Sequence, residues 1–472
     1  MNIPHHTLKT QEMISCNLDD GGLGVWKSQI PNPKFAKKFQ IYKFLETNLD
    51  FIFFKLLIFI GIWFLEFGIL SVPVSFAAQL PLTYRHQHHI FELESNEQKD
   101  WKTHQEVWTH NGKPIKPLAE FRIDGDLIPQ LPKGVIRHTV VTWDREAIRR
   151  ILTERISSRL DREQGTSVIK MTGTGVLFEG IGLSGLKVDL DKAVDLTIQA
   201  IENNISDVIL PVEEIQPVLN IDKKLQKMGI KEVVSVGESD FSGSPLARKH
   251  NIRTGLAKFN GAIIEEGATF SFNKILGTVN RSTGYKEELV ILGERTLPDY
   301  GGGLCQVSTT AYRGAWEYGF PITERRNHSF AVMYYSPHGT DATIYPPHSD
   351  MEFVNDSSGA ILIQTYADEQ NRAYYIYYGT KDDRNSEIIG PYTWDHQSPP
   401  PDRTEYTKDI PPGTTRKAGG RVPGLIAMWY RIVSRGDEEI VEPFYSVYEA
   451  RPNLTQIGVS DMPGEKPSWI GE

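Results

Sequence analysis

The chain has 472 residues with 39% hydrophobic residues, enough for about three domains with a substantial core. Its net charge of −9, without a basic stretch interleaved with aromatic residues, excludes a nucleic-acid partner. Two cysteines cannot make a disulfide scaffold, and no phosphate-binding loop or dinucleotide fingerprint is visible, so we expect no metal and no cofactor.

Residues 51–78 are strongly apolar and predict a single membrane span, since about 20 apolar residues cross a bilayer. Glu66 lies in the middle of this segment, where a carboxylate is unfavourable. Because the upstream flank is rich in lysine, residues 1–50 are expected in the cytoplasm and everything after the span outside the cell. The end of the segment, residues 75–78 (SFAA), resembles a cleavage site, so a removed leader is the alternative to a single-pass anchor in the cell membrane.

Residues 79–133 are polar and show no clear periodicity, which favours a solvated linker. They include residues 85–89 (RHQHH), a tract that can also be interpreted as metal-binding. Few acidic residues lie nearby and the spacing matches no defined metal site, so we expect an ordinary linker next to the membrane.

Residues 134–222 are expected to form a small α+β domain. Residues 135–143 have the pattern of a strand, and Asp144 is placed to cap a helix. Short strands follow, and Asp189 opens a second amphipathic helix. Helices and strands without strict β–α–β alternation are typical of the α+β class. No residue in this domain has a catalytic pattern, so it is either a binding module or a spacer.

Two further units follow along the chain. Residues 233–380 are rich in glycine, aromatic and β-branched residues, which predicts a strand-rich domain with one cysteine-bearing helix. A proline-rich linker is expected over 390–401, and a small all-β appendage over 402–460. The predicted fold class is therefore α+β, in a membrane-anchored chain of several domains.

Cys305 lies in the run 301–310 (GGGLCQVSTT), at the start of a helix predicted to end at Gly319. The three glycines predict a tight loop that another backbone or a substrate can approach closely. A helix start favours the thiolate, and its free N–H groups could bind an oxyanion. The other cysteine, Cys16, lies upstream of the span, so the two thiols cannot pair. Cys305 is thus a candidate nucleophile; the alternative is a buried structural cysteine.

His328 is the candidate base for this thiol. It lies just before residues 330–335, which we predict to be a strand that would bring the imidazole near the cysteine helix. His338 and His348 are the competing histidines. Asp341 could orient the imidazole or be an ordinary turn aspartate.

Two arginines, Arg325 and Arg326, directly precede this histidine. A guanidinium can hold a substrate carboxylate through two parallel hydrogen bonds, so these residues are candidates for substrate binding. The alternative is that both side chains are merely solvated at the surface.

The stretch from about 241 to 378 resembles the VanW-like family. One departure is visible: residues 265–267 read EEG where the family usually has Pro-Gly-Glu, which changes a turn. The matching runs are Arg248 with Asn251-Ile252, Asn260-Gly261, Gly267–Asn273, Gly284-Tyr285, Gly301–Thr310, Glu324-Arg325 with His328-Ser329, Gly339 with Asp341-Ala342, and Phe353 with Asn355.

The resemblance implies a role at the cell wall. Residues 134–222 look like the peptidoglycan-binding module that often precedes such domains, and 402–460 are loosely similar to small extracellular G5-like β modules. Some members of the family are regarded as L,D-transpeptidases. This implies that Cys305 attacks a peptidoglycan stem peptide and that His328 transfers the protons. The residues assigned to substrate or oxyanion binding are Gly302, Gly303, Gln306, Ser308, Arg325, Ser329 and Asp341.

Two other functions stay open at this point. One is a non-catalytic peptidoglycan-binding surface protein, whose glycine loop and arginines grip stem peptides. The other is a cysteine peptidase that uses the same thioester with water as the acceptor. Under all three interpretations the expected partners are peptidoglycan stem peptides, and the membrane through residues 51–78.

Overall fold

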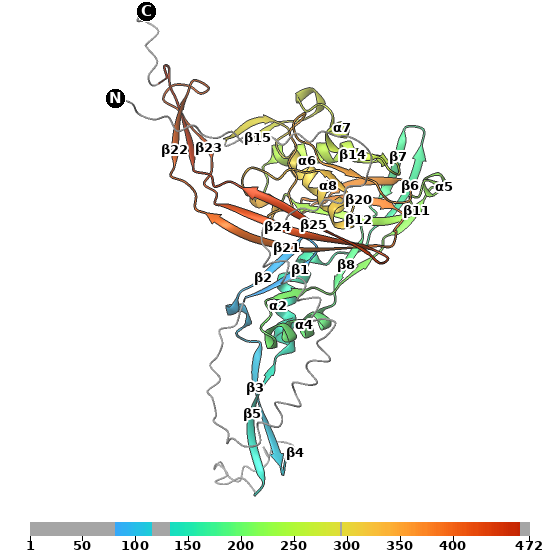
Figure 1. Ribbon diagram of the computed structural model, residues 1–472, viewed down its shortest axis with the longest axis vertical. Coiled ribbons are helices and arrows are strands. Elements are labelled where there is room, and N and C mark those ends of the chain that lie inside the picture. The colour runs from blue at the N-terminus through green and yellow to red at the C-terminus, as the bar shows by residue number, and fades with distance from the viewer. Residues whose placement is uncertain (1–80, 116–132, 293–294, 463–472) are drawn as a thin grey trace, which may run out of the picture. The chain divides into compact units, whose positions relative to one another are not determined.

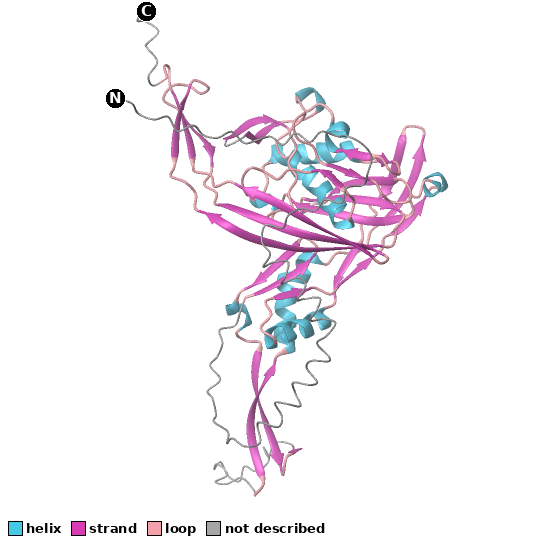
Figure 2. Cartoon of the chain, viewed as in Figure 1, coloured by secondary structure: helices cyan, strands magenta, loops and turns pink. Residues whose placement is uncertain are grey.

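The computed structural model describes residues 81–115, 133–292 and 295–462. The predicted cytoplasmic segment 1–50 and membrane segment 51–78 lie outside these ranges. Within the described ranges, no helix is both long and apolar enough to cross a membrane. This part of the chain is rich in strands, which form several small sheets with helices packed among them (Figures 1 and 2).

Residues 81–115 contain strands, so the prediction of a solvated linker over 79–133 is wrong for this part. The reason is a strand pairing between distant parts of the sequence. β1 pairs with the adjacent β2 and also, in parallel, with the distant β9. The aromatic rings of Tyr84 and Trp101 are fully buried in the same core as the two helices that follow. The strands are β1 (Leu82–His86), β2 (His89–Leu93), β3 (Lys102–His110) and β4 (Lys113–Ile115), with a short 3-10 turn at Ser95–Gln98.

The α+β domain has the predicted caps. The Asp144 side chain accepts a hydrogen bond from the backbone of Ala147, and Asp189 accepts one from Lys192. Its strands are β5 (Val135–Trp143), β6 (Thr166–Thr172), β7 (Gly175–Gly180), β8 (Gly185–Val188), β9 (Asp207–Ile209), β10 (Val212–Ile215) and β11 (Val218–Ile221). Its helices are α2 (Arg145–Leu152), continued by a π turn at Thr153–Ser157 and α3 (Ser158–Leu160), then α4 (Leu190–Glu202) and α5 (Lys223–Lys227).

The central domain is built around α8 (Leu304–Tyr318), the predicted cysteine helix, which ends at Gly319 as expected. The helix packs against a four-stranded sheet of order β12-β20-β19-β13. Contact is close because two glycines face each other: a Cβ on Gly314 would lie 2.6 Å from the Gly237 nitrogen. The sheet strands are β12 (Glu232–Asp240), β13 (Ile263–Ile264), β19 (Ile361–Ala367) and β20 (Arg372–Gly379).

Smaller elements surround this core. The hairpin of β15 (Glu287–Leu292) and β16 (Arg295–Tyr300) leads directly into the glycine loop. The strand predicted over 330–335 does not form; a 3-10 turn at Met333–Tyr335 stands there instead. The remaining elements are α6 (Leu246–Phe259), α7 (Phe272–Leu276), a 3-10 turn at Arg281–Thr283, and the sheet of β14 (Thr269–Ser271), β18 (Glu352–Val354) and β17 (Ile322–Glu324).

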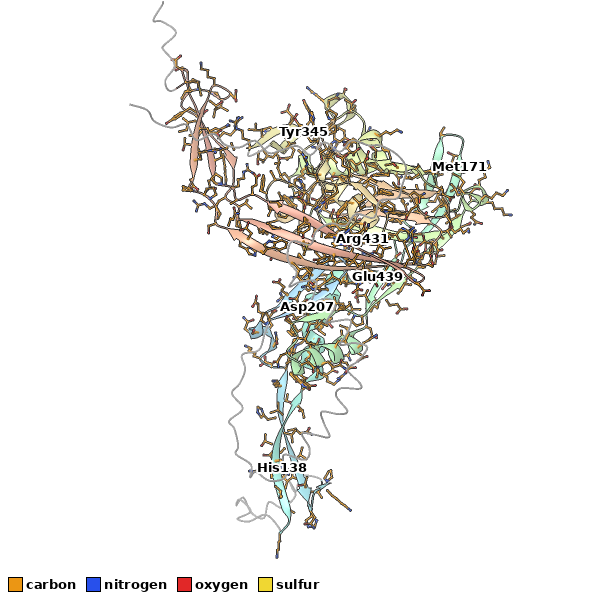
Figure 3. All side chains as sticks on the ribbon, viewed as in Figure 1. His138, Met171, Asp207, Tyr345, Arg431 and Glu439 are labelled. Carbon is orange, nitrogen blue, oxygen red and sulfur yellow. The ribbon has the colours of Figure 1, made fainter. Side chains whose placement is uncertain are left out.

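The C-terminal strands are packed onto the central domain and are not a detached appendage. β21 extends to Gln397, inside the predicted linker 390–401. The rings of Trp429 of β24 and Trp316 of α8 meet edge to face, with their centroids 5.6 Å apart. The buried Arg431 (Figure 3) donates to the carbonyls of Trp316 and Phe320 at 3.0 and 2.8 Å. The strands are β21 (Arg384–Gln397), β22 (Arg403–Thr407), β23 (Thr415–Gly419), β24 (Gly424–Arg435), β25 (Glu438–Tyr448) and β26 (Leu454–Gly458).

Candidate active site

Cys305 is the second residue of α8 and is partly exposed. The helix is preceded by Gly303 with φ 113°, a conformation that disfavours any side chain. A Cβ on Gly302 would lie 2.7 Å from the Leu289 carbonyl of β15, and one on Gly303 would lie 2.9 Å from the Arg248 side chain. The glycines therefore let the hairpin and α6 approach the start of the cysteine helix.

Two polar residues of α6 fix this loop, and the sequence analysis gave neither of them a role. Asn251 donates to the carbonyls of Lys286 and Gly302, at 2.9 and 3.1 Å, and accepts from the Lys286 backbone at 2.8 Å. Arg248 donates to the Gln306 side chain at 3.0 Å. Both side chains are buried, so the loop and the first turn of α8 are held by hydrogen bonds that water does not weaken. The sequence signal that could have identified Arg248 and Asn251 was their presence in the matching runs given in the sequence analysis.

A thiol, an imidazole and a carboxylate meet at this point. His328 Nδ1 lies 2.6 Å from Asp341 Oδ2, and the His328 backbone N–H donates to the same oxygen at 2.8 Å. The imidazole lies close enough to the Cys305 thiol that each group shifts the pKa of the other. Because Nδ1 is taken by the carboxylate, Nε2 is the nitrogen left for the sulfur. The Thr343 hydroxyl lies 3.3 Å from Sγ.

These contacts set the charges of the three groups. Burial raises the pKa of the Cys305 thiol, but His328, Thr343 and the Ile344 backbone together outweigh it, and the pKa falls to about 7. Burial lowers the pKa of His328, whereas Asp341 and Cys305 raise it, to about 9. Hydrogen bonds and charge from His328 hold the pKa of Asp341 far below its usual range, against the effect of burial. Near neutral pH the arrangement therefore favours a thiolate beside an imidazolium.

The surroundings fix the imidazole and the carboxylate in place. The Tyr335 ring stacks on His328 with centroids 4.4 Å apart and 12° between planes. The second oxygen of Asp341 accepts hydrogen bonds from Arg325, at 3.3 Å, and from the Tyr448 hydroxyl of β25. No local pattern marks Tyr448, which lies 107 residues further along the chain in the predicted appendage.

The other predicted site residues make contacts within the protein. Gln306 is fully buried and donates to the Asp240 carbonyl at 3.3 Å, and Ser308 donates to the Ala342 carbonyl at 2.6 Å. The Ser329 carbonyl accepts from the backbone of Glu449 at 2.7 Å.

Arg325 lies among backbone carbonyls. It donates to the carbonyl of Asp341 at 2.7 Å and to that of Gly339 at 3.0 Å, and its side chain is 6% exposed. Of the competing histidines, His348 stacks on Tyr345 (labelled in Figure 3), and His338 lies beside the Tyr448 ring.

The histidine tract 85–89 forms the end of β1, the turn and the start of β2, and its His88 contacts the last turn of α8. His88 is buried and pairs through its backbone N–H and ring nitrogen with Glu317, so the prediction of a solvated tract is wrong. No group of histidine, cysteine and acidic residues in the described part of the chain could hold a metal ion.

A cavity of about 1080 Å³ lies beside the histidine tract, lined among others by His88, Arg313 and Tyr334. Cys305 is not part of its lining.

Arg313 on α8 holds the segment that carries Asp341. It is 3% exposed and donates to the carbonyls of Tyr335, Ser336 and Thr340, at 3.0, 2.9 and 3.3 Å. Replacing it by methionine should lower the free energy of unfolding by about 3 kcal/mol or more, because several buried acceptors lose their donor. Urea unfolding checks this, with Arg326→Met at an exposed position as the control. Equal stability of the two variants would contradict it.

A strand-rich domain with a thiol, an imidazole and a carboxylate at the start of its central helix is therefore the class of protein observed. The family model described as "VanW like protein" matches residues 247–377, a range that contains Cys305, His328 and Asp341. Residues 247–377 thus form a VanW-like domain, which confirms the resemblance noted in the sequence.

Two curated proteins are similar over this region. One is the "Uncharacterized protein YoaR" of Bacillus subtilis (strain 168), 34% identical over 124 residues, which cover 26% of this chain and 41% of that protein. The other is the "Vancomycin B-type resistance protein VanW" of Enterococcus faecalis (strain ATCC 700802 / V583), 27% identical over 141 residues, 26% of this chain and 51% of that protein. The chain thus spans about half the length of these relatives or less. No solved structure matches it significantly.

Proposed function

We propose that this protein is an exported cell-wall enzyme that cross-links peptidoglycan by L,D-transpeptidase-type acyl transfer through a thioester on Cys305. The observation that carries the proposal is the placement of His328, whose ring is bound to Asp341 at 2.6 Å and whose imidazole lowers the pKa of the Cys305 thiol. The name of one relative, a vancomycin resistance protein, supports a location at the cell wall. Residues 51–78 would anchor the chain in the membrane or act as a removed leader.

The first half-reaction uses the thiolate and the imidazolium. Cys305 Sγ attacks the carbonyl carbon after the third residue of a donor stem peptide. The amide bond to the terminal D-residue breaks, and its nitrogen takes a proton from His328, so a free D-amino acid leaves and a thioester remains. The Cys305 backbone N–H donates to no acceptor within the described ranges, so it can stabilise the oxyanion formed during the attack.

The second half-reaction restores the thiolate. The amine of a neighbouring stem attacks the thioester, passes a proton to His328 and expels Sγ, which leaves a new amide cross-link. With water as the acceptor, the same thioester would be hydrolysed. The two outcomes share every protein group, so they differ only in their products.

The test is to trap the acyl-enzyme. The purified chain is incubated with a stem tetrapeptide without acceptor, quenched in acid, and analysed by mass spectrometry of the intact protein and of its peptides. We expect an increase in mass equal to the tripeptide acyl group, located on Cys305, and a cross-linked peptide once an acceptor amine is added. A hydrolysed tripeptide as the sole product would indicate a peptidase. Binding of the peptide without adduct or turnover would indicate a non-catalytic wall-binding protein.

A further inference from the structure

We infer that the sheet of β21, β24 and β25, called here the C-terminal sheet, is part of the active site. Within it, Tyr448 of β25 is a positioning residue, which holds Asp341 in the orientation that His328 needs. The inference rests on the proposed reactivity of the Cys305–His328 pair. Tyr448 lies outside the matched range 247–377, so the family match does not include it.

The Tyr448 hydroxyl acts as a hydrogen-bond donor toward Asp341. The backbone N–H of Gly339 donates to the hydroxyl oxygen at 2.8 Å, so the hydroxyl proton is free to point at Asp341 Oδ1. The ring is 4% exposed, and water does not compete for this contact. Burial and the neighbouring carboxylate raise the pKa of Tyr448 well above its ordinary value, so the hydroxyl stays protonated and remains a donor.

Each oxygen of Asp341 therefore has its own donors. Oδ2 accepts from the ring and the backbone of His328, and Oδ1 accepts from Tyr448 and Arg325. A carboxylate bound on both sides cannot rotate about its Cβ–Cγ bond without losing a buried hydrogen bond. Removing the Tyr448 donor leaves Oδ1 with only the longer contact to Arg325, at 3.3 Å, so the contact with His328 Nδ1 becomes less well aligned.

The same strand also fixes the segment that carries His328. Asn327 donates to the Val447 carbonyl at 2.8 Å, and Arg325 donates to the Ser446 hydroxyl at 2.9 Å. The backbone of Glu449 donates to the Ser329 carbonyl at 2.7 Å. Residues on both sides of His328 are thus bound to β25 or the residue after it. The position of the imidazole relative to Cys305 depends on the C-terminal sheet.

The experiment compares Tyr448→Phe with the wild-type chain and uses the rate of Cys305 alkylation by iodoacetamide as a function of pH. Phenylalanine keeps the ring and its packing, and circular dichroism verifies the fold. We expect the midpoint of the profile to rise by about one pH unit and the rate at pH 7 to fall about five-fold, because a less well aligned Asp341 supports the imidazolium less. The kcat of acyl transfer should fall with KM unchanged.

The control is Tyr445→Phe on the same strand, whose side chain is 46% exposed and whose backbone contact to Arg325 is kept. It should behave as the wild type. A second comparison separates positioning from a general structural role: in an Asp341→Asn background, Tyr448→Phe should cause no further loss of alkylation rate.

Two results would overturn the inference: an unchanged alkylation profile in Tyr448→Phe, or an equal loss in both backgrounds. Alkylation needs no stem peptide. A failure of the proposed transpeptidase function would therefore appear as absent acyl transfer with the alkylation results intact.

Discussion

The Cys305→Ala variant is expected to form no acyl-enzyme and no cross-linked peptide, and to retain its binding to cell-wall material. In the proposed mechanism the thiolate makes the covalent bond, and no other cysteine lies in the described part of the chain. Loss of a nucleophile typically lowers the rate by a factor on the order of 10³ or more. Mass spectrometry of the products and co-sedimentation with purified cell walls measure the two properties separately.

The fold should survive this change, because Cys305 is only partly buried and its sulfur has few partners. A matched control is Ser282→Ala, which removes an exposed hydroxyl elsewhere in the same domain. Cross-linking at the wild-type rate by Cys305→Ala would exclude the thioester mechanism. Loss of wall binding together with loss of cross-linking would indicate that the residue serves binding instead.

The His328→Ala variant is expected to lose most of its thiolate at neutral pH. With the imidazole gone, burial is opposed only by the contacts with Thr343 and the Ile344 backbone, so the thiol pKa should return from about 7 to near its ordinary value of 9.0. At pH 7 this lowers the thiolate fraction about fifty-fold. Acyl transfer should fall further, by roughly 10² or more, since the leaving amine loses its proton donor. Iodoacetamide alkylation and product formation, each followed from pH 5 to 10, measure the two effects.

The wild-type profile provides the reference for this comparison. Acyl transfer should rise as Cys305 loses its proton near pH 7 and fall as His328 loses its proton near pH 9, so the pair is active between these values. His348→Ala is the control, because that imidazole stacks on Tyr345 and is not among the groups that shift the Cys305 pKa. A pH midpoint in His328→Ala equal to that of the wild type would show that the imidazole does not act on the thiol.

The local signals in the sequence were sufficient for several elements. Asp144 and Asp189 cap their helices because an aspartate side chain reaches the free N–H groups of the first turn without help from the rest of the fold. The cysteine helix likewise ends at Gly319, whose φ of 96° closes it. His328 was named as the candidate base for Cys305 and Asp341 as a candidate to orient the imidazole, although the strand predicted to bring His328 there is absent.

The strand predicted over 330–335 does not form because tertiary contacts determine the conformation of this segment. Residues 330–335 have the composition of a strand, but their rings pack individually: Phe330 lies under Arg451, and Tyr335 stacks on His328. The linker over 79–133 was misassigned for a similar reason, since β1 finds its parallel partner β9 more than 120 residues later. A short alternating run such as 82–86 carries too little periodicity to reveal that pairing.

The sequence alone determined that one thiol stands at the start of a helix behind three glycines, because caps, turns and helix ends depend on residues within a few positions of each other. Only the tertiary structure decided which imidazole and carboxylate face that thiol. It also decided that the C-terminal sheet belongs to the site, through the Tyr448 contact with Asp341. The contact between Tyr448 and Asp341 joins residues 107 positions apart. Its specificity comes from packing and buried hydrogen bonds that no local pattern encodes.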